Sequence, residues 1–241
     1  MLELVQRAHE NQSRNNGRVP YWTHLLAVAQ NLDWALELTG ELTDEATRED
    51  LYLAALGHDL YEDTAVQPID VRLQFGERVD AWVQGMTNQG GDQDRAAYVA
   101  RMASAPEEVR LLKLADLLEN TTSCSYGIHD MGVEWVNKTF VPIVTEMRAA
   151  LERSSFTKYK ATGDLLQSLL AYNHERLLRN IVAFELVDTL KAQKPGKQPG
   201  TNKSPDPISQ EAWQRALEWT RERREGERFK RRVFPIPDKD E

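Results

Sequence analysis

Apolar residues recur three and four positions apart along most of the chain, which is the spacing of one face of an α-helix. The segment that begins near Tyr21 shows this spacing, and so does the long segment 163–191. We find no alternating run typical of a half-buried strand, and we predict no hairpin between strands. The sequence therefore predicts an all-α fold in which helices surround one core.

Capping residues and helix breakers mark the ends of the shorter segments. Thr43 or Asp44 is suited to cap the helix that follows it, because both side chains can accept a hydrogen bond from a free backbone N–H. That helix carries the apolar run 51–56. Further helices are predicted from Pro68 to Gly76, over 77–86, over 107–118 behind Pro106, and over 133–151 with a kink at Pro142. Together these helices predict one domain over residues 1–193.

The composition changes abruptly after this region. Residues 194–208 are rich in proline and glycine, which is typical of a linker. Residues 209–241 are predicted to form a basic helical tail whose apolar positions include Trp213, Leu217 and Trp219. We do not expect this tail to bind nucleic acid, because a basic segment is more commonly solvated or docked on an acidic surface of its own protein.

Charge and cysteine content exclude several classes of protein. The 241-residue chain carries a formal net charge of −8, so an anionic substrate would need a cation or an arginine close to it. Its single cysteine, Cys124, leaves no internal disulfide and favours a reducing compartment. No apolar stretch approaches the roughly 20 residues of a membrane span. We therefore expect a cytoplasmic protein without a membrane segment.

Four polar side chains, His58, Asp59, Glu62 and Asp63, follow directly on the apolar run 51–56. On a continuous helix His58 and Glu62 would lie one turn apart, as would Asp59 and Asp63. Imidazole beside carboxylate suits a divalent first-row cation, and further carboxylates can direct a water bound to it. The alternative is an acidic helix end that faces water, but carboxylates at that end oppose the helix dipole. The pattern predicts a metal-dependent hydrolase.

Two more polar residues stand in apolar surroundings. His24 precedes Leu25 and Leu26, and Asp116 interrupts a leucine-rich run one turn before Asn120. A lone histidine at such a position is more often part of the core or surface, and Asp116 could simply pair with Lys113. A buried carboxylate nevertheless needs a cation, a set of donors or a helix end. With the 58–63 cluster, these residues strengthen the prediction of a metal site.

Ordered motifs connect these positions along about the first 150 residues. The motifs are His9-x-x-Gln12-x-Arg14, Pro20-Tyr21-x-x-His24, Gly57-His58-Asp59-x-x-Glu62-Asp63-Thr64, Phe75-Gly76-x-x-Val79 with Gly85-Met86-Thr87, and Lys113-x-Ala115-Asp116-x-x-x-Asn120. In this order they resemble the metal-dependent HD-domain hydrolases of the RelA/SpoT type, specifically the small stand-alone alarmone hydrolases. The resemblance implies an HD-domain helical bundle.

The resemblance also implies a role for each matched residue. His24, His58, Asp59 and Asp116 would hold one divalent cation, Mn²⁺ in this family. Glu62 and Asp63 would position or activate the attacking water. The residues expected to contact a nucleotide substrate are Arg14, Asn120 and Lys113, although a lysine at position 113 is more often simply exposed on the helix surface.

The implied reaction is hydrolysis of the 3′-pyrophosphate of guanosine tetraphosphate or pentaphosphate, giving GDP or GTP and pyrophosphate. Leu117 and Glu119 stand where the family commonly has arginine and histidine, which could weaken substrate binding or alter its choice. Two alternatives remain open: an HD phosphohydrolase acting on another nucleotide, such as NADPH or a nucleoside polyphosphate, and a nucleotide-sensing module without turnover. No segment resembles the synthetase domain of the bifunctional enzymes, and oligomeric state stays open.

Overall fold

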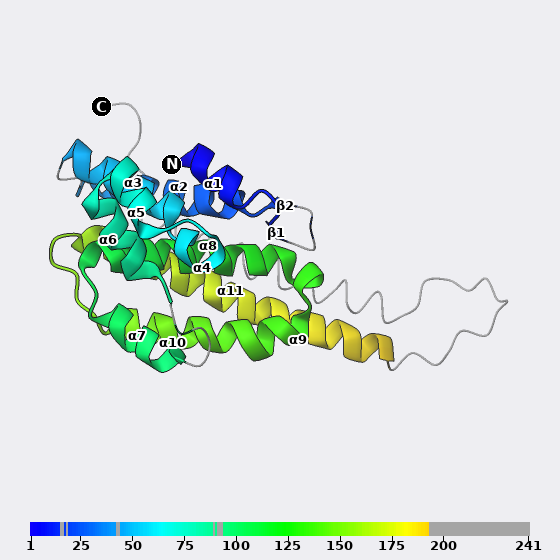
Figure 1. Ribbon diagram of the computed structural model, residues 1–241. Helices are drawn as coiled ribbons and strands as arrows, with labels where there is room; N and C mark the ends of the chain where they lie inside the picture. The colour runs from blue at the N-terminus through cyan, green and yellow to red at the C-terminus, as the bar shows by residue number, and fades with distance from the viewer. Residues whose placement is uncertain (15–16, 18, 42–43, 89, 91–93, 193–241) are drawn as a thin grey trace, which may run out of the picture. The chain divides into compact units, whose positions relative to one another are not determined.

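The helix at the centre of the fold is α8 (Glu107–Met131), which contacts helices on several of its sides (Figure 1). Its first half places Leu111, Leu112 and Leu114 almost consecutively, and each is fully buried. A stretch of helix that is buried on nearly every side must be covered by other elements. The rest of the domain is accordingly packed around α8.

The computed structural model describes residues 1–192 except 15–16, 18, 42–43, 89 and 91–93, with side chains as far as 187. Besides α8, its elements are α1 (Leu2–Ala8), β1 (Ser13–Arg14), β2 (Val19–Pro20), α2 (Trp22–Thr39), α3 (Glu45–Gly57), α4 (Leu60–Asp63), α5 (Pro68–Phe75), α6 (Glu77–Met86), α7 (Arg95–Ala103), α9 (Val133–Trp135), a π-helical turn (Val136–Phe140), α10 (Val141–Glu152) and α11 (Lys160–Ala192).

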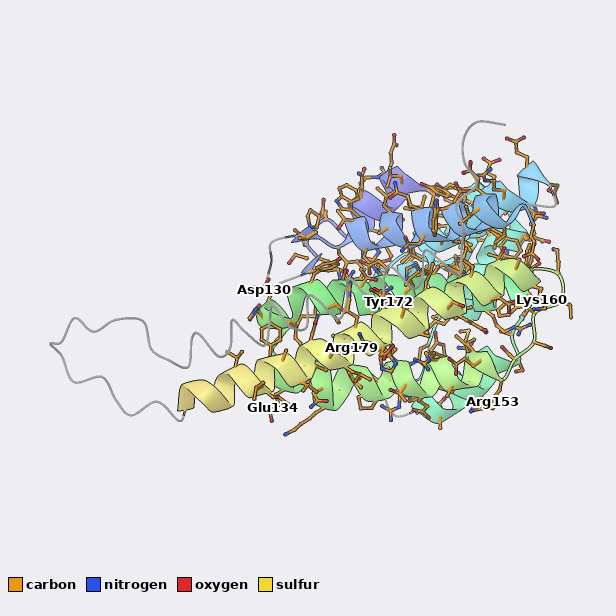
Figure 2. The ribbon with its side chains drawn as sticks, turned by 180° about the vertical axis from the view of Figure 1, so that it is seen from behind. Asp130, Glu134, Arg153, Lys160, Tyr172 and Arg179 are labelled. Atoms are coloured by element: carbon orange, nitrogen blue, oxygen red, sulfur yellow. The ribbon has the colours of Figure 1, made fainter. Side chains whose placement is uncertain are left out.

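Helices pack against α8 in two groups. On one side α2 and α3 lie against each other and against α8, and α6 packs on both α3 and α8. On the other side α10 and α11 contact α8, and Figure 2 shows α11 running along the outside of the bundle. The main core lies between these layers. A smaller apolar cluster of Cys124, Ile128, Val136, Leu177 and Ile181 joins the second half of α8 to α11.

The predicted all-α fold is confirmed, with four differences in detail. The helix that was expected to run continuously into the 58–63 cluster instead ends at Gly57, and α4 begins at Leu60. Helix α8 continues to Met131 well beyond the predicted end, because its second half is buried against α11. Helices α1 and α7 were not predicted, and both are short, at seven and nine residues.

A two-stranded antiparallel ribbon is the fourth difference, because the sequence was expected to form no hairpin. Ser13 pairs with Pro20 and Arg14 with Val19. An Asn-Gly pair at 16–17 stands between the strands in the sequence, and this pair is a common hairpin turn sequence, so the prediction of no hairpin was wrong. The ribbon matters for function because it carries Arg14 to the start of α2.

Local signals explain where the helices that carry the site begin and end. Asp44 caps α3 as predicted, accepting a hydrogen bond from the backbone N–H of Thr47 at 2.7 Å. Gly40 ends α2 in a left-handed conformation with φ of 66°, which a side chain would disfavour. Pro142, where a kink was expected, lies in the first turn of α10, directly after a π-helical turn, and the kink itself stays a prediction.

The predicted linker at 194–208 and the basic helical tail at 209–241 lie outside the described residues, so this division of the chain stays a prediction. Within the described part of the chain, no helix combines the length and the apolar character that crossing a membrane requires.

His174 on α11 supplies a test of the packing against α10. It is buried, with Nδ1 3.1 Å from Nη1 of Arg148 and Nε2 3.3 Å from Oγ1 of Thr145. Burial, and then the charge of Arg148, lowers the pKa of His174 below its ordinary value of 6.5. The unfolded chain therefore takes up a proton at position 174 more readily than the folded chain. The contribution of neutral His174 to the free energy of unfolding is complete above the ordinary pKa and is lost as the pH falls through the lowered pKa of the folded state.

The free energy of unfolding of the parent should fall between about pH 7.5 and about pH 5.5. We expect a smaller fall in His174→Gln, because glutamine cannot take up the proton. Urea titrations of both proteins at the two pH values measure this difference. His129→Gln, at an exposed histidine of α8, is the matched control and should keep the pH dependence of the parent. An equal pH dependence in the His174 variant and the parent would contradict the assignment.

Candidate metal centre

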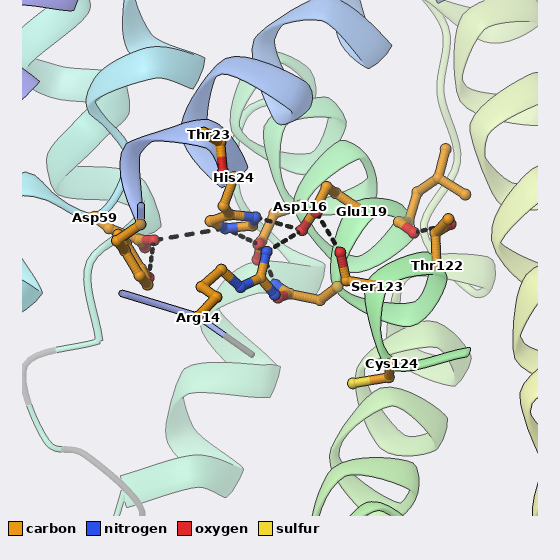
Figure 3. A network of polar contacts seen from close by, with 12 residues as sticks. Arg14, Thr23, His24, Asp59, Asp116, Glu119, Thr122, Ser123 and Cys124 are labelled. Carbon is orange, nitrogen blue, oxygen red and sulfur yellow. Dashed lines mark hydrogen bonds and ion pairs between the residues drawn. The ribbon is translucent and has the colours of Figure 1, made fainter. Parts of the chain in front are cut away.

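Four of the predicted site residues come together from three separate segments, and Figure 3 shows His24, Asp59 and Asp116 among them. His24 lies in the first turn of α2, and Asp116 lies midway along α8. His58 and Asp59 occupy the junction between α3 and α4, where the helix break turns both side chains toward the other two. Both histidines and Asp116 are buried. The predicted ligand set is therefore one cluster in space.

Each of the two imidazoles is oriented by a hydrogen-bond acceptor at Nδ1, the ring nitrogen that faces away from the other ligands. Nδ1 of His58 lies 2.8 Å from the carbonyl oxygen of Ala55, and Nδ1 of His24 contacts a carboxylate oxygen of Glu119. A carbonyl or a carboxylate can only accept, so each Nδ1 carries the hydrogen. The Nε2 atom of each neutral ring is then left with a lone pair, and both Nε2 atoms face the carboxylates of Asp59 and Asp116.

The separations between these atoms suit a first-row cation. Nε2 of His24 lies 3.7 Å from Asp59 Oδ2 and 3.4 Å from Asp116 Oδ1. The corresponding distances from Nε2 of His58 are 3.2 and 3.6 Å. Ligand atoms about 2.0–2.2 Å from a metal stand about 3–3.5 Å from one another. The donors thus surround a space of the right size.

The chemistry of the donor set also fits a cation. Among the described residues, Nε2 of His58 is a buried nitrogen without a hydrogen-bond partner, which is costly unless something else binds it. Ligand atoms of His24, His58 and Asp59 all lie within 4.8 Å of one another, and Asp116 lies beside both rings. Burial lowers the pKa of His58, but the two carboxylates outweigh it and raise that pKa well above its ordinary value. The cluster therefore attracts positive charge.

Asp116 is held by partners on its own helix. Its Oδ2 accepts from Nζ of Lys113 at 2.8 Å, and its Oδ1 accepts from Nδ2 of Asn120 at 2.6 Å. Burial opposes ionisation, but Lys113 and then His24 outweigh it and hold the pKa of Asp116 well below its usual range. Lys113 also lies over the ring of Tyr98 and is only 16% exposed. The alternative of a surface lysine at this position is wrong.

Glu62 and Asp63 lie beside the cluster with a different electrostatic character. Glu62 lines a cavity with His58 and Asp59, and its Oε1 accepts from the backbone N–H of Asn88 at 2.6 Å. Partial desolvation raises the pKa of both carboxyls, and the negative charge of Asp59 raises both further. A carboxylate with a raised pKa accepts a proton more readily, which is what a general base requires.

The cavity next to the cluster has a volume of about 190 Å³. Small-molecule sites commonly enclose about 300–1,000 Å³, so it is large enough for part of a nucleotide but not all of it. Its polar side includes two of the proposed ligands, His58 and Asp59, together with Glu62 and Lys113. Its apolar side is formed by Met86, Val99, Leu117, Ile143 and Met147.

Arg14 and Asn120, the two other predicted substrate contacts, are bonded to each other in the structure. Nη2 of Arg14 donates to Oδ1 of Asn120 at 2.7 Å, and Nη1 donates to Glu119 at 2.7 Å (Figure 3). Both therefore lie at the site, although the Nη atoms of Arg14 are already engaged by protein. Their contact with substrate stays a prediction.

Two residues at the site were given no role from the sequence. Tyr21 donates a hydrogen bond to Asp59 at 2.7 Å, and Glu119 contacts His24. Tyr21 could have been found from its place in the motif, three residues before His24. Glu119 was noticed only as a departure from a motif, because nothing in one sequence shows that position 119 faces α2.

Comparison with known proteins places this architecture. A 26% identical relative is the guanosine-3′,5′-bis(diphosphate) 3′-pyrophosphohydrolase of Borreliella burgdorferi, aligned over 206 residues that make up 76% of this chain and 29% of that protein. The pyrophosphohydrolase MESH1 of Xenopus tropicalis is 33% identical over 116 residues, or 46% of this chain and 60% of that protein. No protein-family model matches the chain.

A solved structure agrees with these relatives. A metazoan ortholog of SpoT, described as hydrolysing ppGpp, superposes with a TM-score of 0.57 over 70% of this chain and 90% of its own, at 22% identity. The chain carries an HD domain of the RelA/SpoT type. At this identity the superposition shows the fold of the HD domain alone. The chain spans less than two thirds of the curated relatives named here.

A divalent cation is expected to stabilise the HD domain by binding its native state. At a free concentration about 100 times the dissociation constant, the gain is about 2.7 kcal/mol, which raises Tm by about 5–10 °C for a chain of this size. Thermal unfolding with and without MnCl₂ measures the shift.

The Asp59→Asn variant should lose most of this shift, because it removes a ligand charge. Asp33→Asn changes a carboxylate bonded to Arg48 elsewhere in the domain, and it should keep the shift. An equal rise of Tm in both variants would place the cation at another site.

Proposed function

We propose that this protein hydrolyses the 3′-pyrophosphate of guanosine tetraphosphate or pentaphosphate, releasing pyrophosphate and GDP or GTP. The observation that carries the proposal is the convergence of two Nε2 atoms and two carboxylates beside Glu62 and Asp63. The relatives indicate the substrate class, because three quarters of this chain aligns with a guanosine-3′,5′-bis(diphosphate) 3′-pyrophosphohydrolase.

In this proposal His24, His58, Asp59 and Asp116 hold one Mn²⁺ ion. The ion would polarise a phosphoryl oxygen and lower the pKa of the attacking water. Two imidazoles and two carboxylates are ligands that a borderline divalent ion accepts, and they leave positions for water and substrate. Tyr21 supports this set by donating to Oδ2 of Asp59, which fixes the direction of that carboxylate.

Glu62 or Asp63 accepts the proton of the attacking water. Both carboxyls have raised pKa values, so each holds a transferred proton better than an ordinary carboxylate. Glu62 also lines the cavity that contains His58 and Asp59. We therefore assign the role of general base to Glu62, and we assign Asp63 a supporting role through its negative charge.

Positive charge for the phosphates comes from the same site. Lys113 lines the cavity and stays protonated, because the Asp116 carboxylate outweighs the effect of burial and raises the pKa of the ammonium. A cation in this position offsets the repulsion that a net charge of −8 would exert on a polyphosphate. We also propose a cytoplasmic setting, supported by the single cysteine.

The proposed reaction is tested with metal-free protein, guanosine tetraphosphate and a panel of other nucleotides that includes NADPH. Mn²⁺ is added back and the products are identified. Pyrophosphate released from guanosine tetraphosphate is the expected result. Orthophosphate from another nucleotide would favour the other phosphohydrolase, and binding without any product would favour a sensing module.

Asp59→Ala should lower kcat at least about a thousandfold, because several kcal/mol of metal-derived stabilisation of the transition state are lost. Circular dichroism and product analysis are made on the same sample, so that loss of fold is separated from loss of activity. Unchanged pyrophosphate release would contradict the metal assignment.

Glu62→Gln should lower kcat by about 10²–10⁴-fold, the contribution of a general base. The raised pKa of Glu62 means that the base is ionised only at higher pH than an ordinary glutamate of pKa about 4.3. The activity of the parent should therefore be low at acid pH and should rise with pH until the Glu62 carboxyl is ionised. A pH profile that keeps its acid limb unchanged in Glu62→Gln would assign the base to Asp63.

A further inference from the structure

Glu119 lies behind the candidate metal centre and makes three hydrogen bonds with both of its carboxylate oxygens. Oε2 accepts from Nδ1 of His24 and from Nη1 of Arg14, the latter at 2.7 Å. Oε1 accepts from the hydroxyl of Ser123 at 2.6 Å. The residue is only 9% exposed, so these partners replace nearly all of its contact with water. A buried carboxylate this fully bonded has a fixed position.

The contact with His24 decides which ring nitrogen carries the hydrogen. A neutral imidazole has one N–H and one lone pair, and a metal can bind only the lone pair. A carboxylate on Nδ1 holds the hydrogen there, which leaves Nε2 as the acceptor that faces Asp59 and Asp116. A carboxylate that accepts from Nδ1 also makes the lone pair of Nε2 more basic, so that Nε2 binds a cation more strongly.

The other ring at the site is oriented without a side chain. Nδ1 of His58 donates to the backbone carbonyl of Ala55, which is an intrinsic part of α3. His24 lies in the first turn of α2, and its Nδ1 is held instead by a residue of α8. Correct orientation of His24 therefore depends on one side chain that comes from another helix.

Arg14 compensates the negative charge of Glu119. Its Nη1 donates to Glu119, while its Nη2 donates to Asn120, whose own amide donates to Asp116 at 2.6 Å. One guanidinium thus supports two groups, each of which contacts a proposed metal ligand directly. The Nη atoms of Arg14 that could bind a phosphate are bonded to protein.

We propose that Glu119 is the positioning residue that holds His24 with Nε2 directed at the metal, and that Arg14 acts through Glu119 rather than on the substrate. This inference rests on the metal site of the proposed function and does not depend on the substrate. It assigns position 119, where the family motif commonly has histidine, a role in ligand orientation.

The first test measures Mn²⁺ binding by electron paramagnetic resonance in the full chain without nucleotide. Glu119→Gln should weaken binding about 10–100-fold, as loss of a group behind a histidine ligand commonly does. Glu108→Gln is the matched control, because it makes the same change on α8 at a residue bonded to Lys158, and it should leave Mn²⁺ affinity unchanged. Affinity within about twofold of the parent in Glu119→Gln would overturn the proposal.

A second measurement needs no variant, and so does not depend on whether Glu119→Gln folds. In protein loaded with diamagnetic Zn²⁺, the His24 ring should show a strongly downfield proton on Nδ1 by nuclear magnetic resonance, because that hydrogen is shared with a carboxylate. A His24 ring with its proton on Nε2, or a parent protein that binds neither cation, would overturn the proposal.

A double-mutant cycle tests the role of Arg14. Arg14→Leu should weaken Mn²⁺ binding in the parent and add little further loss in the Glu119→Gln background, because the two residues act through one contact. Equal losses in both backgrounds would overturn this part. If guanosine tetraphosphate is not hydrolysed while Glu119→Gln still loses Mn²⁺ affinity, the proposed function fails and the positioning role of Glu119 stands.

Discussion

The site depends on two hydrogen bonds that are made behind the imidazoles. Nδ1 of His58 donates to the Ala55 carbonyl, and Nδ1 of His24 donates to Glu119. Without these bonds each ring could present either nitrogen, and the carboxylates of Asp59 and Asp116 would face a mixture of donors and lone pairs. With them, four groups offer lone pairs or negative charge to one buried space, a concentration that is tolerable only if positive charge enters it.

The helical architecture could be predicted because it follows from local patterns. The apolar spacing of α2 and α11 and the cap at Asp44 each act within a few residues, so one sequence contains the information. The same holds for His24, His58, Asp59 and Asp116, which carry polar groups into apolar surroundings and match ordered motifs. The structure brings them together as expected, and their roles as ligands remain predictions.

Features that depend on contacts between distant segments could not be predicted in this way. The break between α3 and α4 turns His58 and Asp59 toward α2 and α8, yet the apolar run before it reads as an uninterrupted helix. The contact of Glu119 with His24 joins residues 95 positions apart. Lys113 likewise has the sequence context of a surface lysine, and only its tertiary packing against Tyr98 shows that it is mostly buried.

The different acceptors behind the two histidines make the two ligands unequal under mutation. The carbonyl of Ala55 belongs to the main chain, so no substitution can remove it while the helix remains. Glu119 is a side chain, and single-nucleotide changes in its codon can replace it. Substitutions at position 119 can therefore change the affinity for a cation while every ligand is retained. The orientation of His58, in contrast, persists as long as the helix that carries Ala55 is formed.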